Sequence, residues 1–189
     1  MHNGHVTSAF PHATGKQLGY QPDAVDAFLE RARRSYEVGE QHAASGMTSA
    51  EVRSTAFPLK RKGYAARFVD AAMDRLEEVF FERERRMRIE EVGEEAWWAE
   101  TKQLLSEVRG RIMRPRKSRF RRRGWFASGY RRSEVDGFLE RVSGLLAGTG
   151  SLSTAEVRSA VFHSEWRGYD EDQVDALLDA VIQLMLTVR

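Results

Sequence analysis

Four stretches of the chain carry apolar residues at every third or fourth position. In the last stretch these residues are Val174, Leu177, Leu178, Val181, Leu184 and Met185. This spacing puts them on one side of an α-helix, whereas a half-buried strand would show a period of two. The pattern predicts an all-α protein in which each of four helices buries one apolar stripe.

A common motif introduces each stretch. Glycine and tyrosine come first, and valine and aspartate follow five and six residues after the tyrosine. The four copies are Gly19, Tyr20, Val25 and Asp26; Gly63, Tyr64, Val69 and Asp70; Gly129, Tyr130, Val135 and Asp136; and Gly168, Tyr169, Val174 and Asp175. We expect each tyrosine to be a buried anchor whose hydroxyl finds a partner, with the glycine permitting the turn before it. Each aspartate lies near a helix start, where its charge opposes the helix dipole.

The four repeats form two similar pairs. Residues 48–57 and 153–162 have nearly the same sequence, and they precede only the second and the fourth repeat. An ancestral two-repeat unit was therefore duplicated whole. The predicted organisation is a first repeat pair over 1–80, with repeats at about 7–42 and 48–80, a charged helix and basic linker over 81–118, and a second pair over 119–189, with repeats at about 119–147 and 153–189.

Helix-start signals agree with these repeats. They are Pro22 at a first helical position, and the capping pairs Thr48 with Glu51, Ser153 with Glu156, and Asp170 with Gln173.

The second helix is predicted to be unusually long. It runs from about Arg67 toward Met113 and is interrupted only by Gly93. Residues 82–88 are almost wholly charged, so we expect this part to stand in solvent, stabilised by pairs such as Glu82 with Arg86. Of the adjacent Trp97 and Trp98, about 100° apart on a helix, one is expected to pack inward.

A helix with a single apolar stripe must cover that stripe. Repeats one and two, and repeats three and four, can pair within the chain as coiled-coil-like hairpins or pseudo-dimers. Alternatively, matching stripes can meet across two chains. The pattern leaves self-association and intrachain pairing both open.

The charge is unevenly distributed. The chain has 30 Lys and Arg against 28 Asp and Glu, a net charge of +2. The stretch from Arg109 to Arg132 contains eleven basic residues and no acidic one, so the other 165 residues sum to 2 − 11 = −9. Its aromatic residues Phe120, Trp125 and Phe126 allow three interpretations: an anionic membrane surface, single-stranded nucleic acid, or a linker that pairs with acidic residues of the chain.

Several classes of function are not expected. The chain has no cysteine, which excludes disulfides and thiolate chemistry and fits a reducing cytoplasm. Residues 1–10 lack the apolar core of a signal peptide, and no apolar run is long enough to span a bilayer. We find no catalytic triad, phosphate-binding loop or paired catalytic carboxylates, and the histidines are scattered. We therefore expect no enzyme activity, no cofactor and no metal.

These motifs resemble the N-terminal domain of DivIVA, the bacterial scaffold of cell division and polar growth. Residues 166–178 read Trp-Arg-Gly-Tyr-Asp-Glu-Asp-Gln-Val-Asp-Ala-Leu-Leu, which is nearly the whole signature of that family. Repeats one and three keep the Val-Asp-X-Phe-Leu helix half, and repeat two is weakest because Ala72-Met73 replaces Phe-Leu. The resemblance covers four segments, most of the chain apart from about 81–118.

The resemblance implies a non-enzymatic adaptor in bacterial division or polar cell-wall growth, cytoplasmic or peripheral at the inner face of the membrane. Its expected partners are an anionic membrane surface and division or cell-wall proteins with coiled coils. The basic segment Arg109 to Arg132 leaves a nucleic-acid-binding protein as the alternative, and the helical repeats leave a module that binds proteins alone. The resemblance also implies that an aromatic residue before Gly-Tyr inserts into the membrane beside a basic residue, which only Trp166-Arg167 matches. The candidate membrane-binding residues are Trp166, Arg167, Phe120, Arg121, Arg122, Arg123, Trp125 and Phe126.

Overall fold

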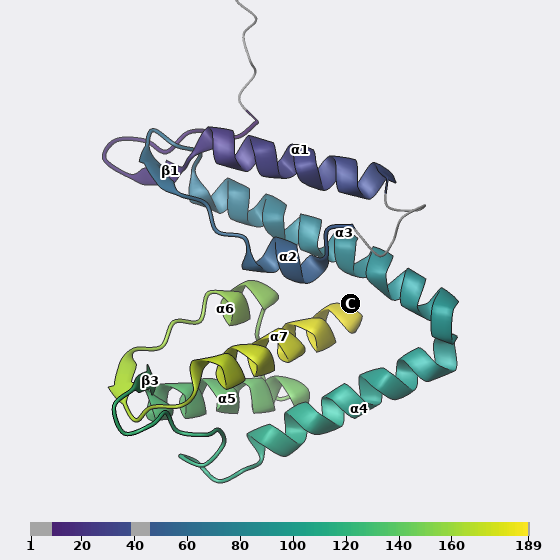
Figure 1. Ribbon diagram of the computed structural model, residues 1–189, viewed down its shortest axis with the longest axis vertical. Helices are drawn as coiled ribbons and strands as arrows, with labels where there is room; N and C mark the ends of the chain where they lie inside the picture. Colours follow the sequence, from purple (N-terminus) through teal and green to yellow (C-terminus); the bar gives the residue numbers. More distant parts are fainter. Residues whose placement is uncertain (1–8, 39–45, 189) are drawn as a thin grey trace, which may run out of the picture. The chain divides into compact units, whose positions relative to one another are not determined.

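The structure is a computed structural model that describes residues 9–38 and 46–188. The described residues up to Met87 belong to a first compact unit, and those from Arg88 onward form a second. Helices dominate both units (Figure 1), so the predicted mainly helical class is confirmed.

The two units contain the same order of short strands and helices. The first unit holds β1 (Leu18–Tyr20), α1 (Pro22–Val38), α2 (Ser49–Ser54), β2 (Leu59–Arg61) and most of α3 (Ala66–Val92). The second holds α4 (Glu94–Ile112), β3 (Ser128–Tyr130), α5 (Arg132–Leu146), α6 (Thr154–Arg158), β4 (Ser164–Trp166) and α7 (Glu171–Thr187). The second unit thus has one helix, α4, ahead of the order that the units share.

The strands are absent from the all-α prediction. In each unit, the strand that contains the first Gly-Tyr pair forms an antiparallel two-stranded sheet with the residues before the second pair. Leu18 pairs with Arg61 in one sheet, and Ser128 pairs with Trp166 in the other. Each strand has only three residues, too few for an alternating pattern to be read. Its partner strand lies far away in the sequence, so local sequence carries no signal for the pairing.

The predicted helix starts are confirmed. Pro22 opens α1, and the Thr48 side chain accepts from the Glu51 backbone N–H at 3.0 Å. Ser153 and Glu156 form a complete capping box, and Asp170 caps α7 by accepting from the backbone of Gln173 at 3.3 Å.

The core of the first unit lies between α1 and α3. Phe28, Ala32 and Phe80 pack together with Val52 of α2, and Val25, Tyr64 and Val69 continue this core toward the sheet. In the second unit, α4 packs against α5 and α7. Trp97, Val108 and Ile112 of α4 are buried, whereas Trp98 is 39% exposed, as expected for one of two adjacent indoles.

Residues 82–88 do not stand wholly in solvent, contrary to the expectation for a charged helix. Arg83 is only 8% exposed; it donates to the carbonyl oxygens of Met47 at 2.6 Å and Ser35 at 3.1 Å. These bonds give both terminal nitrogens of the buried guanidinium a partner, which lowers the cost of burying its charge. The expected pair of Glu82 with Arg86 is also wrong, because Glu82 bonds Arg85 at 3.4 Å.

The predicted long helix ends at Val92. Gly93 has φ +87°, a conformation that glycine adopts readily and other residues rarely do, so α3 and α4 are separate helices. Because α4 packs in the second unit, residues 81–118 are not a separate helix and linker.

Candidate functional site

The motif tyrosines and aspartates hold paired repeats together. Each tyrosine approaches the aspartate of the other repeat in its unit, not the aspartate of its own. The hydroxyl groups donate from Tyr64 to Asp26 at 3.0 Å, from Tyr169 to Asp136 at 3.1 Å and from Tyr130 to Asp175 at 3.4 Å, and Tyr20 hydrogen-bonds Asp70. The motif tyrosines and aspartates therefore stabilise each unit by bonding one another across two repeats.

The motif glycines allow two backbones to approach closely. A Cβ atom at Gly129 would overlap the carbonyl oxygen of Tyr169, and one at Gly168 would overlap those of Gly129 and Tyr130. Gly19 and Gly63 meet the backbone of each other's repeat in the same way. None of the four has a left-handed φ. Turns do precede Gly63 and Gly168, whose N–H groups donate to the carbonyl oxygens of Lys60 at 3.2 Å and Glu165 at 2.9 Å, but Lys62 and Arg167 adopt the positive φ.

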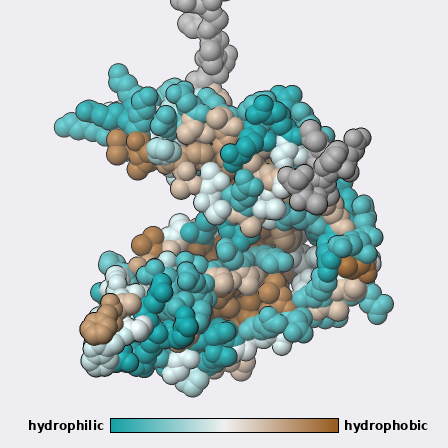
Figure 2. Space-filling view, viewed as in Figure 1, coloured by the Kyte–Doolittle hydropathy of each residue, from teal (hydrophilic) through white to brown (hydrophobic). Residues whose placement is uncertain are grey.

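An exposed aromatic cluster lies at the sheet of the second unit. Phe126 is 97% exposed, Trp125 61% and Trp166 59%. Together with Arg167 they form what we call the aromatic tip. Apolar surface is visible at this end of the second unit, near β3 and β4 (Figures 1 and 2). Side chains of this size are rarely exposed together without a binding role.

Contacts between the two repeats order the aromatic tip. The indole N–H of Trp166 donates to the carbonyl oxygen of Trp125 at 2.9 Å, and the two rings meet edge to face at 5.3 Å. The Arg167 guanidinium lies 4.9 Å from the ring centre of Trp125 and 5.7 Å from that of Trp166. Arg167 has φ +53° in the turn after β4, between the strand and Gly168. A cation is thus held against an exposed apolar surface.

Phe120 is not part of this exposed surface. It is 5% exposed and packs edge to face on Tyr169 at 5.1 Å. Its prediction as a membrane-binding residue is therefore wrong. Arg121 bonds Asp170 at 2.9 Å, which holds the pKa of that carboxyl below its usual range, and Arg123 lies 3.8 Å from the same carboxylate. Arg122 is exposed. The aromatic tip is therefore smaller than the predicted site.

Much of the basic segment is neutralised within the chain. At least six of its eleven bases form ion pairs with carboxylates: Arg116, Arg119, Arg121, Arg123, Arg131 and Arg132. Arg109 and Arg111 donate to backbone carbonyl oxygens. Within the described parts of the chain, the side chains of Arg114, Lys117 and Arg122 have no such partner.

The β1–β2 sheet of the first unit, which corresponds to the sheet at the aromatic tip, carries a different surface. Lys60, Arg61 and Lys62 are exposed there beside Leu18 and Leu59, which are 53% and 59% exposed. Lys62 has the same left-handed turn conformation as Arg167, with φ +56°. The two leucines lie at opposite ends of the short ladder, because Leu18 pairs with Arg61 and Leu59 with Tyr20. The sequence alone gives no sign that they share a sheet, since the two strands are about forty residues apart.

The comparisons with known proteins add no relative. No protein-family model, no curated protein and no solved structure matches this chain. No helix within residues 9–38 and 46–188 is long and apolar enough to cross a membrane. The same residues contain no group of three or more side chains that could hold a metal ion; His2, His5 and His42 lie outside them.

Proposed function

We propose that the protein is a non-enzymatic, DivIVA-like adaptor that binds an anionic membrane surface through the aromatic tip and recruits helical partner proteins. Its setting would be bacterial cell division or polar cell-wall growth, at the inner face of the membrane. The observation that carries the proposal is the exposure of Trp125, Phe126 and Trp166 around the cation of Arg167.

The chemistry of the aromatic tip suits a bilayer interface. Indole rings favour the headgroup level, where the ring is in apolar surroundings and the N–H remains near polar groups. Burial of a phenylalanine side chain is worth about 1.5–3 kcal/mol, and a basic residue near an anionic surface adds about 1 kcal/mol. Because contacts between the two repeats already order Trp125, Trp166 and Arg167, their binding costs little additional side-chain entropy.

The repeat motif supports the DivIVA-like assignment of the same site. Trp166 and Arg167 directly precede Gly168 and Tyr169, the arrangement that the resemblance associates with membrane insertion. Trp125 and Phe126 of the third repeat lie outside that signature, yet Trp125 contacts both residues of the pair. The proposed membrane site therefore combines two repeats of one chain.

Cosedimentation with vesicles tests the membrane site. The vesicles contain phosphatidylglycerol and phosphatidylcholine, with phosphatidylcholine alone as the lipid control. We expect Phe126→Ser to weaken binding at least tenfold, because about 1.4 kcal/mol is a factor of ten. We expect Arg167→Gln to weaken binding to the anionic vesicles only, by about fivefold.

Met113→Ser is the matched control, because Met113 is 83% exposed but lies at the end of α4, outside the aromatic tip. Circular dichroism checks that all variants fold. Unchanged sedimentation of both tip variants, or equal losses with Met113→Ser, would show that the aromatic tip is not the lipid site.

A further inference from the structure

Helix α4 covers one flank of the helix pair in the second unit. It packs against both α5 and α7, and Arg109 donates to the carbonyl oxygen of Leu146 at 3.1 Å. Leu184, the fifteenth residue after Tyr169, is only 5% exposed. Helix α3 of the first unit is the counterpart of α7. Its opposite flank is covered by α2, as the Arg53–Glu77 ion pair at 2.8 Å shows. The flank that carries Leu184 is thus a helix-binding face.

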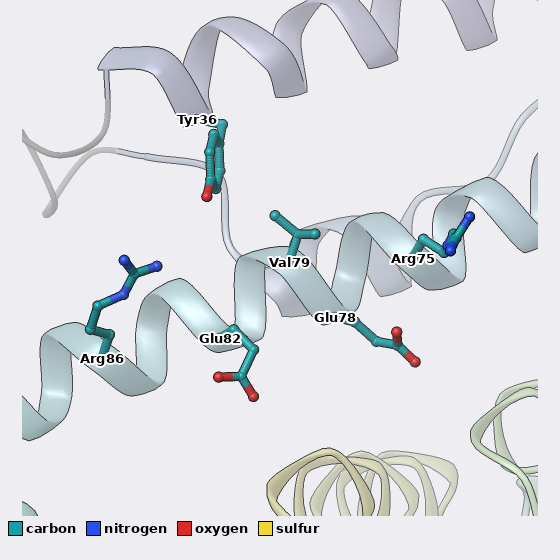
Figure 3. Close-up of a pocket in the computed structure, with 6 residues that line it drawn as sticks. All are labelled: Tyr36, Arg75, Glu78, Val79, Glu82 and Arg86. Carbon is teal, nitrogen blue, oxygen red and sulfur yellow. The ribbon is translucent and has the colours of Figure 1, made fainter. Parts of the chain in front are cut away.

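The corresponding flank of the first unit is open. Val79, the fifteenth residue after Tyr64, is 44% exposed, and Tyr36, the counterpart of Leu146, is 42% exposed. Together they line a groove of about 290 Å³ between α1 and α3 (Figure 3). The complete lining is Tyr36, Arg75, Glu78, Val79, Glu82 and Arg86. The described residues of the first unit include no counterpart of α4.

The groove has an apolar centre with a cation toward each end. In Figure 3, Tyr36 projects from α1 toward α3, and Arg75 and Arg86 lie on either side of Val79. The two arginines are eleven positions apart, which is about 16.5 Å, or three turns of helix. Neither forms an ion pair among the described residues. Glu78 and Glu82 also line the groove, but in Figure 3 their carboxylates point away from Tyr36. A ligand with an apolar stripe and acidic groups three turns apart would therefore complement the side that Tyr36 faces.

We propose that this groove binds an amphipathic helix of a separate partner protein, seated as α4 is seated in the second unit. The apolar stripe of that helix packs on Tyr36 and Val79, and acidic residues about three turns apart pair with Arg75 and Arg86. The inference rests on the partner-recruiting half of the proposed function and gives it a site. It is independent of lipid binding, because no residue of the groove belongs to the aromatic tip.

A synthetic peptide of residues 93–113, the sequence of α4, is the probe. The chain contains no cysteine, so Glu82→Cys can be labelled with an environment-sensitive dye in the full-length protein. We expect the peptide to shift the dye emission to the blue, saturating in the micromolar range. The same dye at Glu90→Cys, about two turns further along α3 and outside the groove, should not respond.

Variants of the groove decide the outcome. Val79→Glu in the labelled protein should weaken peptide binding at least tenfold, since it puts a charge at the apolar centre. Val161→Glu, at an 86% exposed valine outside the groove, should leave binding unchanged. Val79→Glu should still sediment with anionic vesicles, so that failure here is distinguishable from failure of the membrane site.

Three results would overturn the proposal. The first is that the emission of the dye at position 82 does not change up to millimolar peptide. The binding could be unchanged in Val79→Glu, which would indicate exchange with α4 in the second unit. The unliganded protein could already be a dimer by light scattering that Val79→Glu dissociates, which would make a second copy of the chain the occupant.

Discussion

The hydroxyl of Tyr169 lies at the centre of a buried polar cluster. It accepts from the backbone N–H of Arg119 at 3.2 Å and donates to Asp136 at 3.1 Å, in a side chain with no exposed surface. Burial, together with the charge of Asp136, raises the pKa of Tyr169 to about 12. The pairing between repeats three and four therefore depends on a protonated phenol.

Tyr169→Phe should destabilise the second unit by about 1–3 kcal/mol, because it leaves the Asp136 carboxylate and the Arg119 N–H without their bonds to the hydroxyl. In the wild type the folded pKa is raised above the unfolded value of about 10. The contribution of Tyr169 to stability is therefore fully present below about pH 10 and is lost as the pH rises through about 12. Urea unfolding across this range should show a smaller pH dependence for Tyr169→Phe.

Tyr36→Phe is the control for this experiment, since Tyr36 is 42% exposed and lies outside the motif. It should keep the alkaline dependence of the wild type. Equal pH dependence in wild type and Tyr169→Phe would mean that the buried hydroxyl does not govern alkaline unfolding.

At the level of elements, the helices follow from local sequence and the sheets do not. The three-to-four spacing and the capping pairs determine where α1 and α7 begin. The sheets arise because paired glycines let two distant backbones come within hydrogen-bonding distance. No local pattern predicts that approach. The glycine before each tyrosine is the one feature of the sequence that corresponds to it.

The candidate site was predictable to a similar extent. Trp166 and Arg167 were found from the motif, and Trp125 and Phe126 from the aromatic residues of the basic segment. Phe120 was misassigned because its neighbours are all basic, and only the packing on Tyr169 reveals that it is core. The groove beside Val79 could not be predicted, since it depends on which flank of a helix has no neighbour.

Gly168→Ala tests the close approach of the two strands. The added methyl would overlap the carbonyl oxygens of Gly129 and Tyr130, which are backbone atoms and cannot move independently. We expect a loss of about 1–3 kcal/mol in the unfolding free energy of the second unit, the usual cost of overpacking. Thermal and urea unfolding followed by circular dichroism measure this loss.

Gly110→Ala provides the matched control within the same unit. Gly110 lies inside α4, and a Cβ there meets nothing within 4 Å. This variant should stabilise the unit by about 0.5–1 kcal/mol through helix propensity. If the two variants changed stability by the same amount, the glycine before Tyr169 would have no special steric role.

At the scale of the whole molecule, the net charge of +2 conceals extensive internal pairing. The basic segment forms ion pairs with acidic residues of α5, β4 and the start of α7, all within the second unit. Six basic residues of this segment are therefore held by ion pairs, and several of these pairs connect different elements of the second unit. This arrangement favours the linker and membrane interpretations over a nucleic-acid groove, in which the cations would be free to meet phosphates.

The salt dependence of nucleic-acid binding distinguishes these interpretations. For single strands, log K falls with log salt at a slope of about −0.7 per phosphate neutralised. Eleven free bases would give a slope of about −8, whereas the five without a carboxylate partner among the described residues would give about −3.5. We expect the shallow slope, measured by fluorescence anisotropy of a labelled oligothymidine at increasing sodium chloride.

Two variants check this interpretation. Arg122→Gln should reduce the magnitude of the slope by about 0.7, because Arg122, which has no ion pair among the described residues, is free to meet a phosphate. Arg132→Gln, which removes a partner of Glu165 at 3.3 Å, should leave the slope unchanged. A slope near −8 would mean that the internal ion pairs open on contact with the strand, and it would make nucleic acid the better-supported partner.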